Sequence, residues 1–129
     1  MKLIHTGLTR DQINTAARAF LDISSDSLKT DSLASLLYKS DGPFWNRTMV
    51  WEYNQPQITV AQLDTILNQF GVRAVVVGHS EHDSLTFLFD GHLYAIDTPV
   101  QEAGGFEGLL LENGQFYRVT PDGQKHLLE

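Results

Sequence analysis

Two histidines each follow a short apolar stretch and stand beside a glycine, an arrangement that can present an imidazole to a ligand. His79 comes directly after the run Val75–Gly78, and the carboxyl end of a buried strand is where ligands usually bind in α/β layers. His5 follows Leu3-Ile4 and precedes a turn with a glycine. Neutral imidazole is the commonest metal ligand, so both are candidate ligands. The alternative for His79 is a turn or capping histidine, which the spacing alone favours.

Arg47 is the candidate for binding an anion, because a guanidinium is a planar fork that matches phosphate. It ends the segment GPFWNR at residues 42–47, which is aromatic and begins with a Gly-Pro breaker. The alternatives are stacking of Arg47 on Trp45 or Trp51, or simple solvation, and the residues by themselves favour these.

The other histidines carry less information. His82 forms an H-x-x-H pair with His79, but in a loop that spacing means little. His92 falls in a predicted hairpin and His126 near the end of the chain, so we expect both at the surface.

Helices are predicted in the first half of the chain. Capping boxes, in which a Thr and the Gln three residues later satisfy each other's backbone, begin helices at Thr9 and Thr59. Apolar residues at helical spacing follow, so we predict helices over 9–23, about 30–39 and 59–70. Ser24-Ser25-Asp26 interrupts the pattern, and Gly71 suits a left-handed C-terminal cap.

Strands are predicted in the second half. The apolar run Val72–Gly78 is typical of a strand covered on both faces. Asp90-Gly91 and Asn113-Gly114 each separate two strand-like segments and predict hairpins. The fold class is therefore α+β: about three helices, then a buried strand and two hairpins in a largely antiparallel sheet. We expect a single domain over 1–129, mainly helical over 1–71 and mainly strands over 72–129.

Composition excludes several classes of function. The chain has 129 residues, 42% of them apolar, which suits one domain with a real core. Its 16 acidic and 9 basic residues give a net charge of −7, whereas nucleic-acid binding needs a basic patch. The absence of cysteine excludes disulfides and cysteine nucleophiles. A spanning helix needs about 20 apolar residues, far more than the run Ala74–Val77. We expect no nucleic-acid or membrane partner and a cytoplasmic protein.

Four segments carry a family resemblance: LTRDQINTAARAFL at 8–21, GPFWNR at 42–47, VVVGHS at 75–80 and FLFDGHLYAIDTPVQEAGGFEGLLL at 87–111. In this order they resemble the carboxyl-terminal half of a calcineurin-like metallophosphoesterase, in the branch of bacterial enzymes related to protein serine/threonine phosphatases. The first resembles the helix after the family's His-Gly-Gly turn. The others resemble its Gly-Pro-Leu-Trp-Tyr-Arg segment, its strand plus Gly-His-Thr motif, and its closing strands.

The resemblance implies a site that holds two divalent metal ions and a substrate phosphoester. His79 would be a metal ligand from the Gly-His motif. His5 would be another, with His5-Thr6-Gly7 standing for the His-Gly-Gly turn. Arg47 would hold the phosphate. No catalytic residue is carried over, because the family's first half, with its Asp-x-His, Gly-Asp-x-x-Asp-Arg-Gly and Gly-Asn-His motifs, is taken to be missing.

These observations predict the carboxyl-terminal portion of a metal-dependent phosphoesterase that hydrolyses phosphomonoesters or phosphoproteins. The isolated chain is expected to be inactive, since its metal site is incomplete. The alternative is a non-catalytic binding or interaction module derived from the same fold. Because the missing half would normally cover part of this one, we also expect the chain to self-associate as a dimer.

Overall fold

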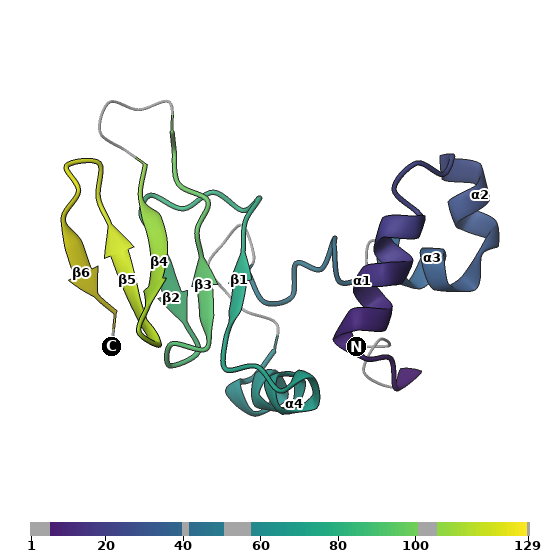
Figure 1. Ribbon diagram of the computed structural model, residues 1–129, viewed down its shortest axis with the longest axis horizontal. Helices are drawn as coiled ribbons and strands as arrows, with labels where there is room; N and C mark the ends of the chain where they lie inside the picture. The colour runs from purple at the N-terminus through teal and green to yellow at the C-terminus, as the bar shows by residue number, and fades with distance from the viewer. Residues whose placement is uncertain (1–5, 40–41, 51–57, 101–105, 129) are drawn as a thin grey trace. The chain divides into compact units, whose positions relative to one another are not determined.

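The structure is a computed structural model that describes residues 6–39, 42–50, 58–100 and 106–128. The chain divides into two compact units, Met1–Met49 and Val50–Glu129, which are described separately here (Figure 1). Within the described residues, helices come first and strands follow: α1 (Arg10–Ala19), α2 (Ser25–Thr30), α3 (Ser32–Tyr38), α4 (Val60–Phe70), β1 (Val75–Val77), β2 (Thr86–Leu88), β3 (Leu93–Ala95), β4 (Gly108–Glu112), β5 (Gln115–Val119) and β6 (Lys125–Leu127). The predicted α+β class is confirmed, whereas the single domain stays a prediction.

Local hydrogen bonds begin and end the helices as predicted. At the start of α1, the Thr9 amide donates to Gln12 Oε1 at 2.8 Å and the Gln12 amide donates to Thr9 Oγ1 at 3.3 Å. Thr59 and Gln62 make the same pair of bonds at the start of α4. That helix ends at Gly71, whose φ of 60° places it in the left-handed region that favours glycine.

An additional short helix corrects the prediction of about three helices. The described residues contain four, because the polar residues predicted to be a break begin α2. Ser24 Oγ accepts a hydrogen bond from the Ser27 amide at 3.3 Å, and Lys29 pairs with Asp26 at 3.0 Å. The first helix is also shorter than predicted, because α1 ends at Ala19 and not at residue 23. Ser24-Ser25-Asp26 then starts a helix, because Ser and Asp are good N-terminal caps.

The helices of the first unit pack around a small core. Ala17, Ala34 and Leu37 are buried there. The Tyr38 hydroxyl at the end of α3 donates to the Ala17 carbonyl of α1 at 2.7 Å, so a hydrogen bond as well as apolar contact holds these two helices together.

The first sheet of the second unit is mixed, with strand order β1-β3-β2. β1 runs parallel to β3, with Val75 opposite Leu93 and Val77 opposite Ala95. β2 and β3 form the first predicted hairpin, and Asp90 and Gly91 have φ of 55° and 81° in its turn. The prediction of one largely antiparallel sheet is therefore wrong for this sheet. The strand β1, which precedes the hairpin in the chain, pairs with β3 in parallel.

Coverage of β1 also differs from the prediction. The apolar run around Val75–Val77 indicates a strand buried on both faces, yet the Val76 side chain is 48% exposed. β1 is the outer strand among the described members of its sheet. The central strand is instead β3, whose residues Leu93, Tyr94 and Ala95 are all at most 3% exposed.

The second sheet is antiparallel, with strand order β4-β5-β6. Asn113 and Gly114 have φ of 50° and 78° and join β4 to β5, which confirms the second predicted hairpin. The Phe116 ring of β5 lies 4.3 Å from the Tyr94 ring of β3, centre to centre, so aromatic contact joins the two sheets. The Arg73 guanidinium lies 4.4 Å from the centre of the Phe116 ring on the same cluster.

Candidate functional site

His79 lies where the sequence predicts it, directly after β1. The Ile96 amide donates to the Val77 carbonyl at 2.9 Å, so the parallel strands β1 and β3 end side by side. The backbone of His79 has a φ of 70°, which is uncommon for a residue other than glycine. The residue is exposed. Its imidazole is therefore accessible to a ligand at the carboxyl edge of the mixed sheet.

The loop that carries His79 is attached to the end of β3. The His82 amide donates to the Asp97 carbonyl at 2.9 Å. His79 follows the end of β1 by two residues and Asp97 follows the end of β3 by two residues, so both lie just beyond the same edge of the sheet. His82 is half-buried, and its Nε2 has no hydrogen-bond partner among the residues that the structure describes.

Asp97 is the residue at this edge that sequence reasoning missed as a candidate. The closing segment with Ile96-Asp97 contributed to the resemblance, but nothing in the sequence pairs it with the strand before His79. The signal is the parallel pairing of β1 with β3, which exists only in the folded chain.

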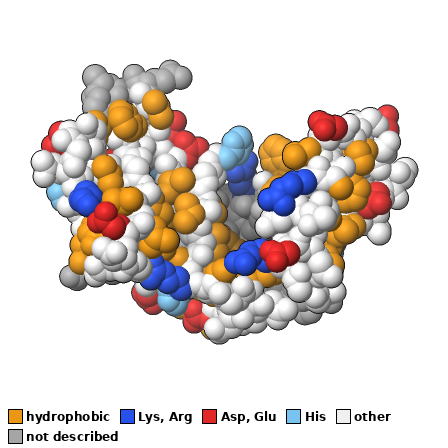
Figure 2. Space-filling model, viewed as in Figure 1, with side chains coloured by type: hydrophobic (Ala, Val, Ile, Leu, Met, Phe, Trp, Pro, Cys, Tyr) orange, Lys and Arg blue, Asp and Glu red, His pale blue; other side chains and the backbone are white. Residues whose placement is uncertain are grey.

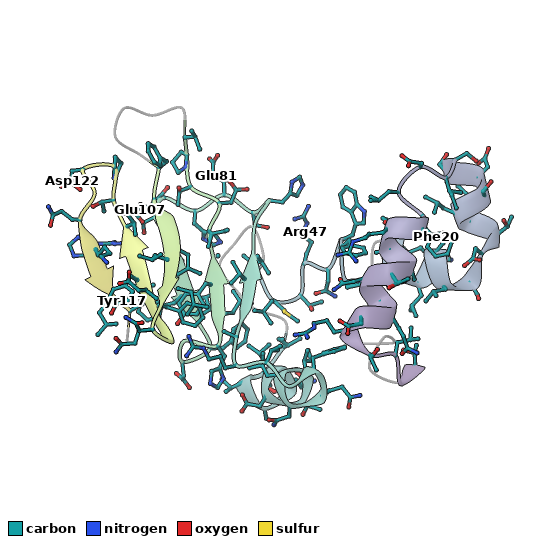
Figure 3. All side chains as sticks on the ribbon, viewed as in Figure 1. Phe20, Arg47, Glu81, Glu107, Tyr117 and Asp122 are labelled. Atoms are coloured by element: carbon teal, nitrogen blue, oxygen red, sulfur yellow. The ribbon has the colours of Figure 1, made fainter. Side chains whose placement is uncertain are left out.

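Arg47 ends a tightly packed turn in the other unit. The Gly42 amide donates to the Lys39 carbonyl at 2.8 Å and the Trp45 amide donates to the Gly42 carbonyl at 3.1 Å. Asn46 Oδ1 accepts hydrogen bonds from the amide and the hydroxyl of Thr48, at 3.0 and 2.6 Å. These bonds flank Arg47 on both sides in sequence, and its side chain is half-buried (Figure 3).

The three predicted site residues are not described as one cluster. His5 lies outside the described residues. Arg47 belongs to the unit Met1–Met49 and His79 to the unit Val50–Glu129. Among residues 6–39, 42–50, 58–100 and 106–128, no group of three or more His, Asp or Glu side chains could hold a metal ion. These residues do not by themselves fit the expected two-metal centre.

One Asp-x-His triplet does occur, at Asp90-Gly91-His92, contrary to the prediction that this motif is absent. It lies in the β2–β3 turn. The Val75 amide donates to the His92 carbonyl at 2.9 Å, which places the triplet at the start of β1 and at the edge opposite His79. His92 Nδ1 lies 2.9 Å from Asp64 Oδ1 of α4. The His92 side chain lies against this helix and is still 39% exposed, and His126 is exposed as expected.

Charged side chains are dispersed over the face shown in Figure 2, with basic, acidic and apolar groups interspersed.

No helix within the described ranges combines the length and the apolar character that a membrane span requires.

Three solved structures that match this chain are all of a cold-active protein tyrosine phosphatase. The chain superposes on structures of a cold-active protein tyrosine phosphatase with a TM-score of 0.84 and 36–37% sequence identity. One of these is at 1.1 Å resolution, one is a point mutant, and one comes from a psychrophilic Shewanella species. The match covers 99% of this chain but only 37–38% of the other. No protein-family model and no curated protein sequence matches the chain.

The cold-active phosphatase is a calcineurin-like enzyme, and this chain is similar to part of it. The chain is a partial-length relative of that enzyme, and the predicted family resemblance is confirmed. The chain spans well under half the length of the relatives that it matches.

Proposed function

We propose that this chain is the carboxyl-terminal portion of a metal-dependent phosphoesterase and supplies part of its two-metal site. The observation that carries the proposal is the match to a cold-active phosphatase over 99% of this chain at 36–37% identity. Such a match extends to nearly every element of the chain, so a shared role of this portion is the simplest explanation. The metal ions of a complete site would activate a water for attack on phosphorus.

His79 is the proposed metal ligand. It is exposed at the carboxyl edge of the β1–β3 pair, where an imidazole can reach an ion held by other ligands. His5 is the second proposed ligand, on the family resemblance alone. The described residues contain no group of three ligands, and we propose that the rest of the enzyme completes the site.

Arg47 is the proposed phosphate-binding residue. The turn that precedes it is fixed by backbone hydrogen bonds and by the contact of Gly42 with α3, which suits a side chain that must be held in one place. A guanidinium can donate two hydrogen bonds to one phosphate group.

The proposed substrate is a phosphomonoester carried by a phosphoprotein. The solved relatives are named protein tyrosine phosphatases, which makes a phosphotyrosine peptide the first substrate to test. We propose no nucleic-acid or membrane partner, given the net charge of −7, and a cytoplasmic location, given the absence of cysteine.

A chimera tests the proposal. The segment of the cold-active phosphatase that aligns with this chain is replaced by residues 1–129, and hydrolysis of a phosphotyrosine peptide is measured with Mn²⁺. We expect a chimera that folds and retains activity. His79→Ala and Arg47→Ala should each lower kcat/KM by about 100-fold or more, whereas His126→Ala, at an exposed position, should not. A folded chimera whose activity is unaffected by both substitutions would falsify the proposal.

The second candidate is a non-catalytic interaction module built on the same portion of the fold. It is favoured by the lack of a complete metal-ligand group within the described residues. In that case the chimera folds but has no activity, and His79→Ala changes nothing.

We also propose that the isolated chain forms a dimer. Val76 of β1 is 48% exposed on the outer strand of the described mixed sheet, and an apolar edge strand is a template for pairing with another strand. Pairing of β1 with its copy is the simplest symmetric arrangement.

A further inference from the structure

A largely covered carboxylate, that of Glu107, contacts the chain at the end of the loop that carries His79. This loop, Gly78–Ser84, joins β1 to β2, and the residue that follows it, Leu85, is 5% exposed. Glu107 Oε2 accepts a hydrogen bond from the Leu85 amide at 2.7 Å. The two residues are 22 positions apart, so this bond is a tertiary contact and not part of a turn.

Glu107 is itself held from two directions. Its amide donates to Thr98 Oγ1 at 3.1 Å, and Thr98 is only 4% exposed. Its Oε1 lies 3.6 Å from Nη1 of Arg118 on β5, and the Glu107 side chain is only 15% exposed. Thr98 follows β3 and Arg118 belongs to the second sheet. The glutamate therefore connects the ends of both sheets to the β1–β2 loop (Figure 3).

Hydrogen bonds thus fix the loop at successive points. β1 and its pairing with β3 fix the start, and the Asp97 carbonyl holds the His82 amide in the middle at 2.9 Å. Glu107 holds the end at Leu85. The first and second contacts come from the backbone, so they tolerate many side chains. The third depends on one carboxylate, and a charged acceptor on a buried N–H forms a strong bond.

We propose that Glu107 is a positioning residue that anchors the end of the loop Gly78–Ser84 and thereby fixes His79. The anchoring stands on the contacts above, whereas its purpose, orienting a metal ligand, rests on the proposed function. Groups behind a metal ligand commonly set its orientation, and their loss typically weakens metal binding by 10- to 100-fold.

Substitutions separate the geometry of Glu107 from its charge. Glu107→Asp keeps the charge but withdraws the carboxylate by one methylene, so the Leu85 amide loses its acceptor. Glu107→Gln loses the charge but keeps an acceptor oxygen at the same reach. Glu112→Ala is the matched control, because it removes a carboxylate that pairs at 2.9 Å with Lys125 within the second sheet.

The experiment is amide hydrogen exchange by NMR on the full metal-free chain, alongside denaturant unfolding to record global stability. In Glu107→Asp we expect the Leu85 amide to exchange about 10- to 100-fold faster than the change in global stability explains, with a smaller increase at His82. Glu107→Gln should retain most of the Leu85 protection, and Glu112→Ala should retain all of it. Unchanged Leu85 protection in Glu107→Asp overturns the proposal, as does equal loss in Glu107→Gln and Glu107→Asp.

Mn²⁺ titration of the chimera described under the proposed function tests the purpose separately, because the chimera brings this chain together with the ligands of the rest of the enzyme. We expect about 10-fold more Mn²⁺ to be needed for half-maximal hydrolysis in Glu107→Asp than in the unsubstituted chimera, and no more in Glu112→Ala. If the Leu85 amide responds to Glu107→Asp but the Mn²⁺ requirement of the chimera does not, the anchor is supported and its role in orienting a metal ligand is wrong. A folded chimera without activity would instead count against the proposed function.

Discussion

Gly42 lies directly against the carbonyl group of Leu37, so closely that no side chain fits between them. A Cβ at residue 42 would lie 2.5 Å from the carbonyl oxygens of Leu36 and Leu37. These atoms belong to the backbone of α3 and cannot rotate away. The glycine of the GPFWNR segment is therefore required for packing, and the segment that carries Arg47 depends on it.

Gly42→Ala should destabilise the chain by about 2 kcal/mol, since overpacking against a fixed backbone typically costs 1–3 kcal/mol. Urea unfolding measures the change. Gly108→Ala is the control, because nothing lies within 4 Å of a Cβ at that position. Equal stability of the two variants would show that the close contact is relieved at little cost.

His79→Ala should change the free energy of unfolding by less than about 1 kcal/mol, because the side chain is exposed and fills no core space. His79→Val should cost more, since a β-branched residue is strongly disfavoured at a φ of 70°. Thermal unfolding of the metal-free variants distinguishes them. A loss of several kcal/mol in His79→Ala would identify a structural histidine.

Alkaline pH should weaken the fold through Tyr94. Burial raises the pKa of Tyr94 above its ordinary value of 10.0, and the positive charge of Arg73 opposes part of that rise. The folded chain then holds the phenol proton more tightly than the unfolded chain does, so stability falls as pH rises through and above about 10. Tyr94→Phe should lose less stability between pH 9 and pH 11 than the natural chain does, as urea midpoints will show. Tyr117→Phe is the control, because that hydroxyl bonds to Gln115 at an exposed position. Parallel pH curves for the natural chain and Tyr94→Phe would contradict the prediction.

The isolated chain should sediment as a dimer at micromolar concentration, with the β1 edge as its interface. Val76→Lys should shift it toward a 14.5 kDa monomer, since a charge on an edge strand opposes pairing. Leu21→Lys, which changes a 68% exposed leucine outside the sheets, should leave the dimer intact. A monomeric natural chain would mean that residues 1–129 close their own core.

The isolated chain should not hydrolyse an aryl phosphate with Mn²⁺, Zn²⁺ or Mg²⁺ at a rate near 1 per second, the lower end of typical enzyme turnover. The reason is the number of ligands, because the described residues contain no group of three that could hold an ion. A continuous assay at millimolar substrate checks this, with the cold-active relative as the positive control. Turnover that is lost in His79→Ala would show that this chain completes a metal site by itself.

The sequence alone determined those features that depend on chemistry between near neighbours. The Thr9–Gln12 and Thr59–Gln62 caps act across three residues. The turns at Asp90-Gly91 and Asn113-Gly114 need positive φ only in a few adjacent residues, with Phe89 included in the first turn. The order of four short motifs along the chain also indicated the family. No single motif is specific for the family, but their order is more specific than any one of them.

Tertiary structure decided how distant segments pair. The parallel pairing of Val75–Val77 with Leu93–Ala95 belongs to a sheet separate from β4–β6. It brings Asp97 and His79 to the same edge of that sheet. It also puts the apolar β1 on the outside of the described sheet, which leaves Val76 exposed. An apolar run indicates only that a strand is stabilised by being covered. Which residues cover it depends on segments far away in the chain. The hydrophobic effect is not directional, so a sequence pattern does not specify the partner.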